Sequence, residues 1–264
     1  MSRRTLSGDD GSMRLAKRVA ELKGCSRSDA ERYIEGGWVS VNDQVVEEPA
    51  LRVTHETVTI SPDATLLDGG PITLLLHKLV GYECGLGEGS GPQGSRSRGS
   101  PSAMDLLTHE ARSPNDHSGI RILKRHANDL EALAPLPTEA SGLAVFSQDF
   151  RIVRKLTEDI EVMEQEVMAE VHGAVSPEAL ARLCHGLSFN GRPLPPIKVS
   201  ISSDNPDLTR LRFALKGIRP GQVPAMCEAV GLRLLALKRI RLGRVAMAGL
   251  APGHWRYLLP HERF

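Results

Sequence analysis

The sequence lacks paired cysteines, long apolar runs and a strong net charge, and each absence argues against a class of protein. Its four cysteines stand far apart, without a Cys-x-x-Cys pair, at positions 25, 84, 184 and 227. This spacing argues against a disulfide framework or a zinc motif and indicates reduced thiols. No apolar run approaches the roughly 18 residues that span a bilayer, and the polar start at residues 1–12 is unlike a signal peptide. We therefore expect a cytoplasmic protein without a membrane partner.

The charge and composition are those of an ordinary globular protein. The formal net charge is +1 over 264 residues, with 41% hydrophobic and 25% charged residues, so any nucleic-acid site must be a local patch. The length suits one large or two smaller domains. His77, His126 and His172 have no Cys, Asp or Glu partner at a spacing that suggests a metal site or a catalytic triad. We expect no metal and no cofactor.

The first part of the chain predicts a small domain of two helices and short strands. Residues 1–12 predict a disordered tail. From residue 13, Leu15, Val19 and Leu22 recur at helical spacing until Gly24. Ser26 and Asp29 predict the capped start of a second helix, which Gly36-Gly37 ends. Short alternating strands follow to residue 62.

This pattern resembles the S-four-type (alpha-L) RNA-binding domain over residues 13–62. The matching residues are Arg14-Leu15-Ala16-Lys17, Ser26-Arg27-Ser28-Asp29-Ala30, Ile34, Gly37-Trp38-Val39 and Val41-Asn42. The resemblance implies that the exposed basic residues of the two helices face RNA phosphates. These residues are Arg14, Lys17, Arg18, Arg27 and Arg32. The alternative is a solvated helix pair, because Glu21, Asp29, Glu31 and Glu35 balance much of this charge.

Residues 70–264 predict one mixed domain, which makes the chain an α+β protein. Strand-like and helix-like segments alternate, such as the alternating strand 164–171 and the helix that Ser176-Pro177 opens. The Gly/Ser-rich stretch 85–102 predicts a flexible loop. Residues 133–149, reading LAPLPTEASGLAVFSQD, predict a turn-rich loop that enters a buried strand. Site residues commonly lie on such loops.

The second domain resembles the ribosomal RNA pseudouridine synthases. The final quarter carries their Gln222-Val223, Ala229-Val230-Gly231, Ile240-Arg241-Leu242-Gly243 and Pro252-Gly253. In that family the loop reads Gly-Arg-Leu-Asp, two residues, then Thr-Ser/Glu-Gly-Leu, and its Asp is catalytic. Leu136 and Ser141-Gly142-Leu143 match this motif, but Pro137 stands at the Asp position. The resemblance also implies a mixed α/β fold around a central antiparallel sheet.

Pseudouridine formation detaches uracil from its sugar and rejoins it through carbon, so it needs a carboxylate beside the glycosidic carbon. Proline offers none. Further positions differ: Pro135 replaces the family's Arg, Val167 its Tyr, and residues 220–226 lack the arginines of its basic segment. We therefore predict an RNA-binding protein, a monomer on structured ribosomal RNA, whose isomerase site is lost. The implied groove in the second domain would use Lys78, Lys238, Arg239 and Arg241.

Two other functions stay open at this point. Glu139, two residues past the Asp position, could serve as a relocated catalytic carboxylate in a working RNA uridine isomerase, although an exposed loop glutamate is the plainer interpretation. Asp149 follows the same strand and predicts a cap at its end. The third function is a protein-interaction module that has lost RNA binding as well.

Overall fold

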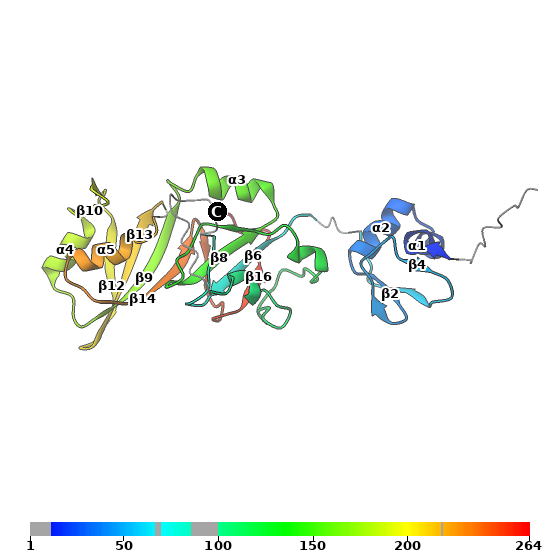
Figure 1. The fold of residues 1–264 in the computed structure, drawn as a ribbon, viewed down its shortest axis with the longest axis horizontal. Helices are drawn as coiled ribbons and strands as arrows, with labels where there is room; N and C mark the ends of the chain where they lie inside the picture. Colours follow the sequence, from blue (N-terminus) through cyan, green and yellow to red (C-terminus); the bar gives the residue numbers. More distant parts are fainter. Residues whose placement is uncertain (1–11, 67–69, 86–99, 218) are drawn as a thin grey trace, which may run out of the picture. The chain divides into compact units, whose positions relative to one another are not determined.

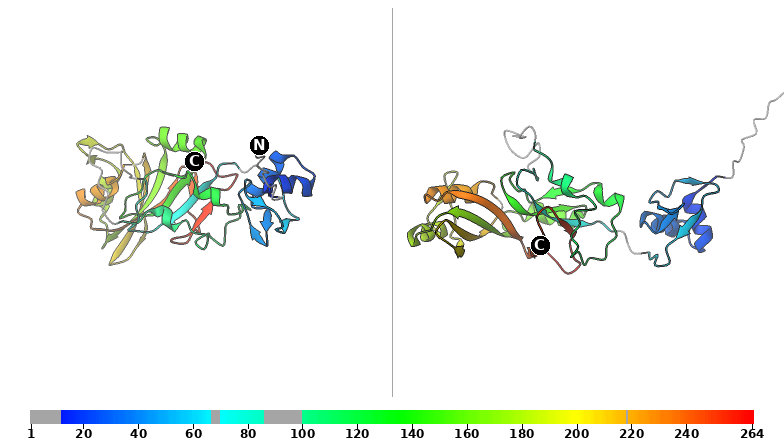
Figure 2. Two further views of the ribbon diagram at one scale, coloured as in Figure 1. Left: turned by 45° about the vertical axis from the view of Figure 1, so that its right-hand side comes forward. Right: turned by 90° about the horizontal axis from the view of Figure 1, so that it is seen from below.

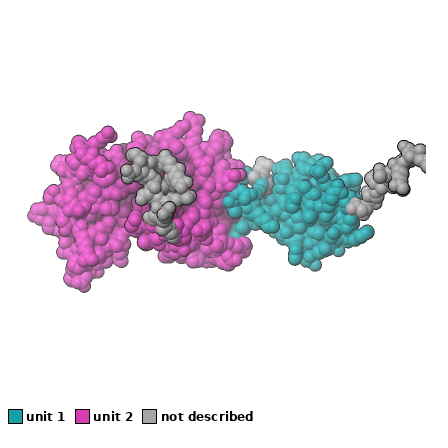
Figure 3. Space-filling model, in the orientation of Figure 1, with its two compact units in different colours: residues 1–70, 120–128 teal, residues 71–119, 129–264 magenta. Residues whose placement is uncertain are grey.

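The structure is a computed structural model that describes residues 12–66, 70–85, 100–217 and 219–264. It divides into two compact units (Figure 3). Unit 1 comprises residues 1–70 and 120–128, and unit 2 comprises residues 71–119 and 129–264. Most of the predicted tail and of the predicted flexible loop lies outside the described residues. No helix in the described part of the chain is long and apolar enough to cross a membrane.

Unit 1 has the two helices and short strands that the sequence predicts (Figure 1). Its elements are β1 (Met13–Arg14), α1 (Leu15–Lys23), α2 (Arg27–Glu35), β2 (Val39–Val41), β3 (Gln44–Val45), β4 (Arg52–Val53) and β5 (Val58–Ile60). The Ser26 hydroxyl accepts a hydrogen bond from the Asp29 amide at 3.1 Å, which confirms the predicted cap. Leu15, Val19 and Ile34 are fully buried between the helices and the sheet.

A segment that follows 50 residues later in the chain completes unit 1. Leu123 is buried, and a Cβ on Gly37 would come within 2.9 Å of its Cδ2. The Arg121 guanidinium lies 4.5 Å from the centre of the Trp38 ring, and the Lys124 amide donates to the carboxylate of Glu47 at 2.7 Å. The predicted boundaries put residues 120–128 in the second domain, whereas the structure groups this docked segment with unit 1. The backbone therefore passes between the units three times.

The docked segment gives unit 1 a specific acid sensitivity. His126 is buried, and burial, followed by the nearby Arg125 charge, lowers its pKa to about 4. Between about pH 6.5 and pH 4 the unfolded chain binds a proton that the folded chain does not bind, so stability falls as the pH falls. We expect unit 1 to lose on the order of 2–3 kcal/mol across this window.

Urea titrations at several pH values measure this loss. The chain has only two tryptophans, so the indole NMR signal of Trp38 reports on unit 1 and that of Trp255 on unit 2. In His126→Gln the pH dependence of the Trp38 transition should be flatter between pH 6.5 and 4. An equally steep loss in this variant would contradict a role for His126.

Unit 2 is built on one large mixed sheet (Figures 1 and 2). Its elements are β6 (Thr73–Lys78), η1 (Ala103–Leu106), β7 (Glu131–Leu133), β8 (Ser141–Ser147), α3 (Phe150–Glu158), β9 (Glu164–His172), α4 (Pro177–Cys184), β10 (Ser188–Phe189), β11 (Arg192–Pro193), β12 (Lys198–Asp204), β13 (Leu208–Lys216), α5 (Gln222–Ala229), β14 (Leu234–Leu242), β15 (Val245–Ala246) and β16 (Trp255–Tyr257). The main strand order is β12-β13-β9-β14-β8-β6-β16. All these neighbours are antiparallel except β14 and β8, which pair in parallel.

Helices cover one face of the sheet at strands β9 and β13, and the opposite face of these strands is exposed. Val167, Ala169 and Val171 of β9 alternate inward, as predicted, and pack with residues of α4 and α5. On the opposite face, which we call the outer face, charges pair across the strands. Arg210 pairs with Glu170, and both Arg212 and Arg241 pair with Glu166. The α+β fold class and the large central sheet are thus confirmed.

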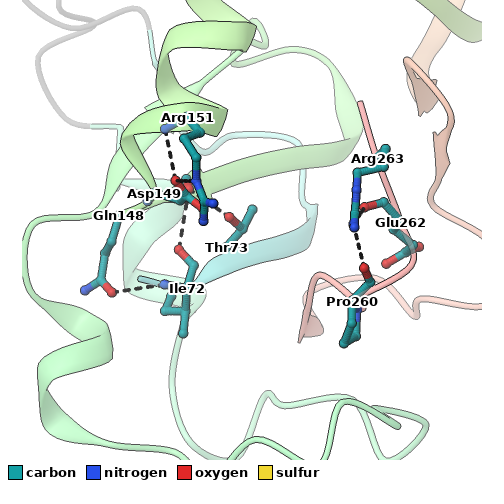
Figure 4. Close-up of polar contacts among 9 residues, drawn as sticks. Ile72, Thr73, Gln148, Asp149, Arg151, Pro260, Glu262 and Arg263 are labelled. Atoms are coloured by element: carbon teal, nitrogen blue, oxygen red, sulfur yellow. Dashed lines mark hydrogen bonds and ion pairs between the residues drawn. The ribbon is translucent and has the colours of Figure 1, made fainter. Parts of the chain in front are cut away.

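Asp149 caps α3 directly after β8 (Figure 4). Its carboxylate accepts from the Arg151 amide at 2.9 Å and from the Arg151 guanidinium at 2.8 and 3.0 Å. The side-chain hydrogen bonds from Arg151 hold the pKa of Asp149 below its usual value, with burial acting in the opposite direction. The prediction of a cap at the end of the strand is thus refined, because Asp149 caps the start of the helix that follows, and its carboxylate is held in the turn between β8 and α3.

Candidate functional site

The loop at residues 134–140 connects β7 to β8, as the sequence predicts. Backbone hydrogen bonds hold it at several points. The Leu136 amide donates to the Cys84 carbonyl at 3.1 Å, and the Gly81 amide donates to the Thr138 carbonyl at 2.8 Å. Within the loop, the Ala140 amide donates to the Pro137 carbonyl at 3.1 Å. The prolines of this loop therefore sit in a fixed turn.

Arg239 of β14 anchors the 134–140 loop from inside the protein. Its side chain is buried, with 1% of its surface exposed. The guanidinium donates to the carbonyls of Ala134 at 2.7 Å, Leu143 at 2.8 Å and Pro135 at 3.4 Å. Burial lowers the pKa of Arg239 to about 10, while Cys84 acts to raise it, so the group stays charged at neutral pH. Its charge is balanced by carbonyl dipoles.

Lys78, the last residue of β6, binds mainly the turn that follows its own strand and makes one contact with the 134–140 loop. It is fully buried, and its ammonium donates to the carbonyls of Tyr82 at 2.7 Å, Leu79 at 2.9 Å and Thr138 at 3.5 Å. Burial lowers the pKa of Lys78 to about 8, although Cys84 and Glu139 act to raise it. Among the described residues, no carboxylate forms an ion pair with Lys78 or Arg239.

A small cavity of about 40 Å³ lies under the loop. Pro135, Pro137, Val167, Leu215 and Leu237 supply apolar atoms to its wall, and residues of α5 and of the turn before it line the other side. A water needs ~10–15 Å³ by this kind of measure, whereas small-molecule pockets usually measure ~300–1,000 Å³. In this conformation the cavity can hold a few waters but no nucleobase.

The sequence is similar to a known domain and to several known proteins. A model of the S4 domain matches residues 13–58. Ribosomal small subunit pseudouridine synthase A of Vibrio vulnificus (strain CMCP6) is 22% identical over 95% of this chain and 97% of its own length. Ribosomal large subunit pseudouridine synthase B of Bacillus subtilis (strain 168) is 26% identical over 94% of this chain and 93% of its own length.

The chain is thus similar over nearly its whole length to ribosomal pseudouridine synthases. A crystal structure of a pseudouridylate synthase has the same fold, with a TM-score of 0.54 and 20% identity over 93% of this chain and 96% of the other. The suspected resemblance is thus confirmed from the S4 domain to the end of unit 2. Identity at this level leaves individual site residues to be judged from this chain's own geometry.

Three of the positions at which this chain differs from the synthase family lie at the small cavity. Pro135, Pro137 and Val167 all line it. Glu139 is exposed and is not among the residues that line the cavity. Cys84 is a buried thiol whose pKa is raised by burial and lowered by the Arg239 and Lys78 charges.

The cations predicted to contact RNA in unit 1 all reach solvent. These are Arg14, Lys17, Arg18, Arg27 and Arg32 on and beside the two packed helices. Arg27 pairs with Glu31 at 3.2 Å, and Arg32 lies 3.8 Å from Asp29. All five are therefore open to a partner, and acidic neighbours offset two of them. RNA contact by these residues stays a prediction.

The four cations predicted for unit 2 differ in burial. Lys78 and Arg239 are buried and bind backbone carbonyls, whereas Lys238 and Arg241 are only partly buried. Arg241 pairs with Glu166 at 3.1 Å. A direct phosphate contact by Lys78 or Arg239 would require the side chain to leave the backbone carbonyls that it binds. The structure favours a positioning role for both residues.

The histidines have ordinary surroundings. The Nδ1 atom of His77 lies 2.7 Å from the Leu250 carbonyl, His126 is buried in unit 1, and His172 is exposed. Within the described ranges, no group of three or more metal-binding side chains comes together. All four cysteines are free thiols.

Proposed function

We propose that this protein is a cytoplasmic monomer that binds structured ribosomal RNA and does not isomerise uridine. The S4 domain and the homology to ribosomal pseudouridine synthases support RNA binding. The exposed Arg14, Lys17 and Arg18 can neutralise phosphates. Free cysteines suit a reducing compartment.

The observation that carries the loss of activity is Pro137 in the wall of a 40 Å³ cavity. The resemblance puts the family's catalytic aspartate at this position, and a proline supplies neither a nucleophile nor a negative charge. The buried Arg239 beside it donates to loop carbonyls and forms no ion pair with a described carboxylate. Both the carboxylate and the space for a flipped base are missing from this conformation.

Glu139 does not supply a replacement in this geometry. Its side chain is exposed and lies outside the lining of the cavity. A misplacement of about 1 Å can already cost about a hundredfold in rate. A working isomerase would therefore need the loop to rearrange so that this carboxylate turns inward.

Tritium release from ribosomal RNA labelled at carbon five of uridine tests the proposal. With the full chain in excess over RNA, we expect binding that weakens steeply with salt and no release above a protein-free control. Pro137→Asp alone should stay inactive, because the cavity still lacks room for the base. Release by the wild type that disappears in Glu139→Gln would establish the isomerase instead. RNA binding that is absent or independent of salt would favour the protein-interaction module.

A further inference from the structure

On the outer face of the unit 2 sheet, the arginines of β13 and β14 pair with carboxylates of β9. Arg210 pairs with Glu170, and both Arg212 and Arg241 pair with Glu166. These cross-strand pairs neutralise that part of the face. A group of unmatched cations on this sheet would therefore stand out as a local positive site.

Such a group lies at one end of β12 and β13. Lys198 begins β12, Lys216 ends β13, and Arg219 lies in the turn before α5. Lys198 stands opposite Ala214, two residues before Lys216, so both lysines project from the outer face. All three side chains are exposed, and no described carboxylate forms an ion pair with any of them.

These three cations line a pocket of about 430 Å³. Pro195, Pro196 and Ile197 form part of its wall, and Arg241 and Glu164 also line it. Glu164 is the one carboxylate in the lining. It stands opposite Lys216 in the pairing of β9 with β13 and lies 3.7 Å from the Arg241 guanidinium, so a single negative charge faces four cations. The pocket therefore keeps an excess of positive charge.

The pocket adjoins the small cavity under the 134–140 loop. Leu215, Arg219 and Gln222 line both hollows. The cavity is small and mainly apolar, whereas the pocket is about ten times larger and basic. The pocket could therefore accept the backbone of an RNA strand, whereas the neighbouring cavity is too small for a base.

We propose that the pocket formed by Lys198, Lys216 and Arg219 binds the phosphodiester backbone of RNA. Two ammonium groups and one guanidinium converge from separate elements, a combination that suits phosphate oxygens. The pocket gives unit 2 an RNA-binding surface of its own, apart from the S4 helices and next to the lost isomerase site. This inference rests on the RNA binding proposed above.

A charge-matched pair of variants tests the pocket. The pocket variant carries Lys198→Gln, Lys216→Gln and Arg219→Gln. The control variant carries Arg151→Gln, Arg154→Gln and Lys155→Gln on α3, where all three cations are exposed and ion-paired. Both lose the same net charge from exposed positions, so a difference between them reports on location. Thermal unfolding should show that both remain folded.

Affinity for deproteinised small-subunit ribosomal RNA is measured over a salt series with the full chain. The pocket variant should bind about tenfold more weakly at low salt, and the slope of log K against log salt should fall by about 1 for each phosphate that the variant no longer neutralises. The control variant should stay close to the wild type. Ultraviolet crosslinks in the wild type should map to residues 195–222.

The outcomes separate this inference from the proposed function. Steep salt-dependent binding by the wild type that is equally steep in the pocket variant would overturn the pocket and leave RNA binding intact. Equal losses in the pocket and α3 variants would also overturn it, because net charge alone would then explain the effect. A wild type that does not bind RNA would overturn both proposals.

Discussion

Replacing Gly142 by alanine is expected to lower the free energy of unfolding by about 3 kcal/mol or more, or to prevent folding. Gly142 lies in β8 where this strand pairs in parallel with β14. Its φ is +108°, a conformation that residues with a side chain rarely adopt. A Cβ there would lie 2.2 Å from the Arg239 carbonyl oxygen and 2.7 Å from the Arg239 amide nitrogen. Backbone atoms in a sheet cannot move aside without breaking the pairing.

Urea unfolding followed by circular dichroism measures this effect, with Gly231→Ala as the matched control. Gly231 also has a positive φ, of +76°, but no atom lies within 4 Å of its Cβ position. The control should therefore lose only the cost of the left-handed backbone, about 1–2 kcal/mol. Equal losses in the two variants would show that the close approach to β14 is unimportant.

Replacing Arg239 by methionine is expected to cost about 3 kcal/mol or more. The variant leaves the carbonyls of Ala134, Pro135 and Leu143 without the guanidinium donors. Each buried carbonyl that loses its hydrogen bond costs about 1–3 kcal/mol. Exchange of the amide hydrogens in residues 134–140 should accelerate as well, because the loop loses its anchor. Urea unfolding and hydrogen exchange with mass spectrometry report on the two effects.

Arg241→Met provides the comparison on the same strand. Arg241 is partly exposed, pairs with Glu166 and Glu164 and donates to the Gly243 carbonyl, so its loss should cost about 1–2 kcal/mol. Exchange in the 134–140 loop should then stay at the wild-type rate. If Arg239→Met were no more destabilising than Arg241→Met, the buried guanidinium would not be the anchor of the loop.

Local signals in the sequence predicted most of the secondary structure. Ser26 and Ser176-Pro177 mark helix starts by capping chemistry, and both caps are present. Strand β9 followed from the alternation of Val167, Ala169 and Val171. These features depend on neighbours within a few residues, which a single sequence displays directly.

The environment of the two buried cations was harder to predict. Residues two apart on a strand lie on the same face. Lys78 therefore shares a face with Leu74 and Leu76, and Arg239 shares one with Leu237, which indicates that both cations face the core. The residue types pointed to the surface, because isolated charges are rarely buried. What decides the outcome is the set of loop carbonyls that converge on each cation, and these come from residues up to 105 positions away. No local pattern displays them.

The docked segment at residues 120–128 bears on how this N-terminal domain could have spread among proteins. A gene fusion that moved residues 1–70 alone would carry Trp38 without Arg121 and Gly37 without Leu123. The recipient protein would need to supply other side chains in place of Arg121 and Leu123. Inheritance of the domain in this form is therefore tied to the rest of the chain, and recombination within residues 71–119 would separate parts that fold together.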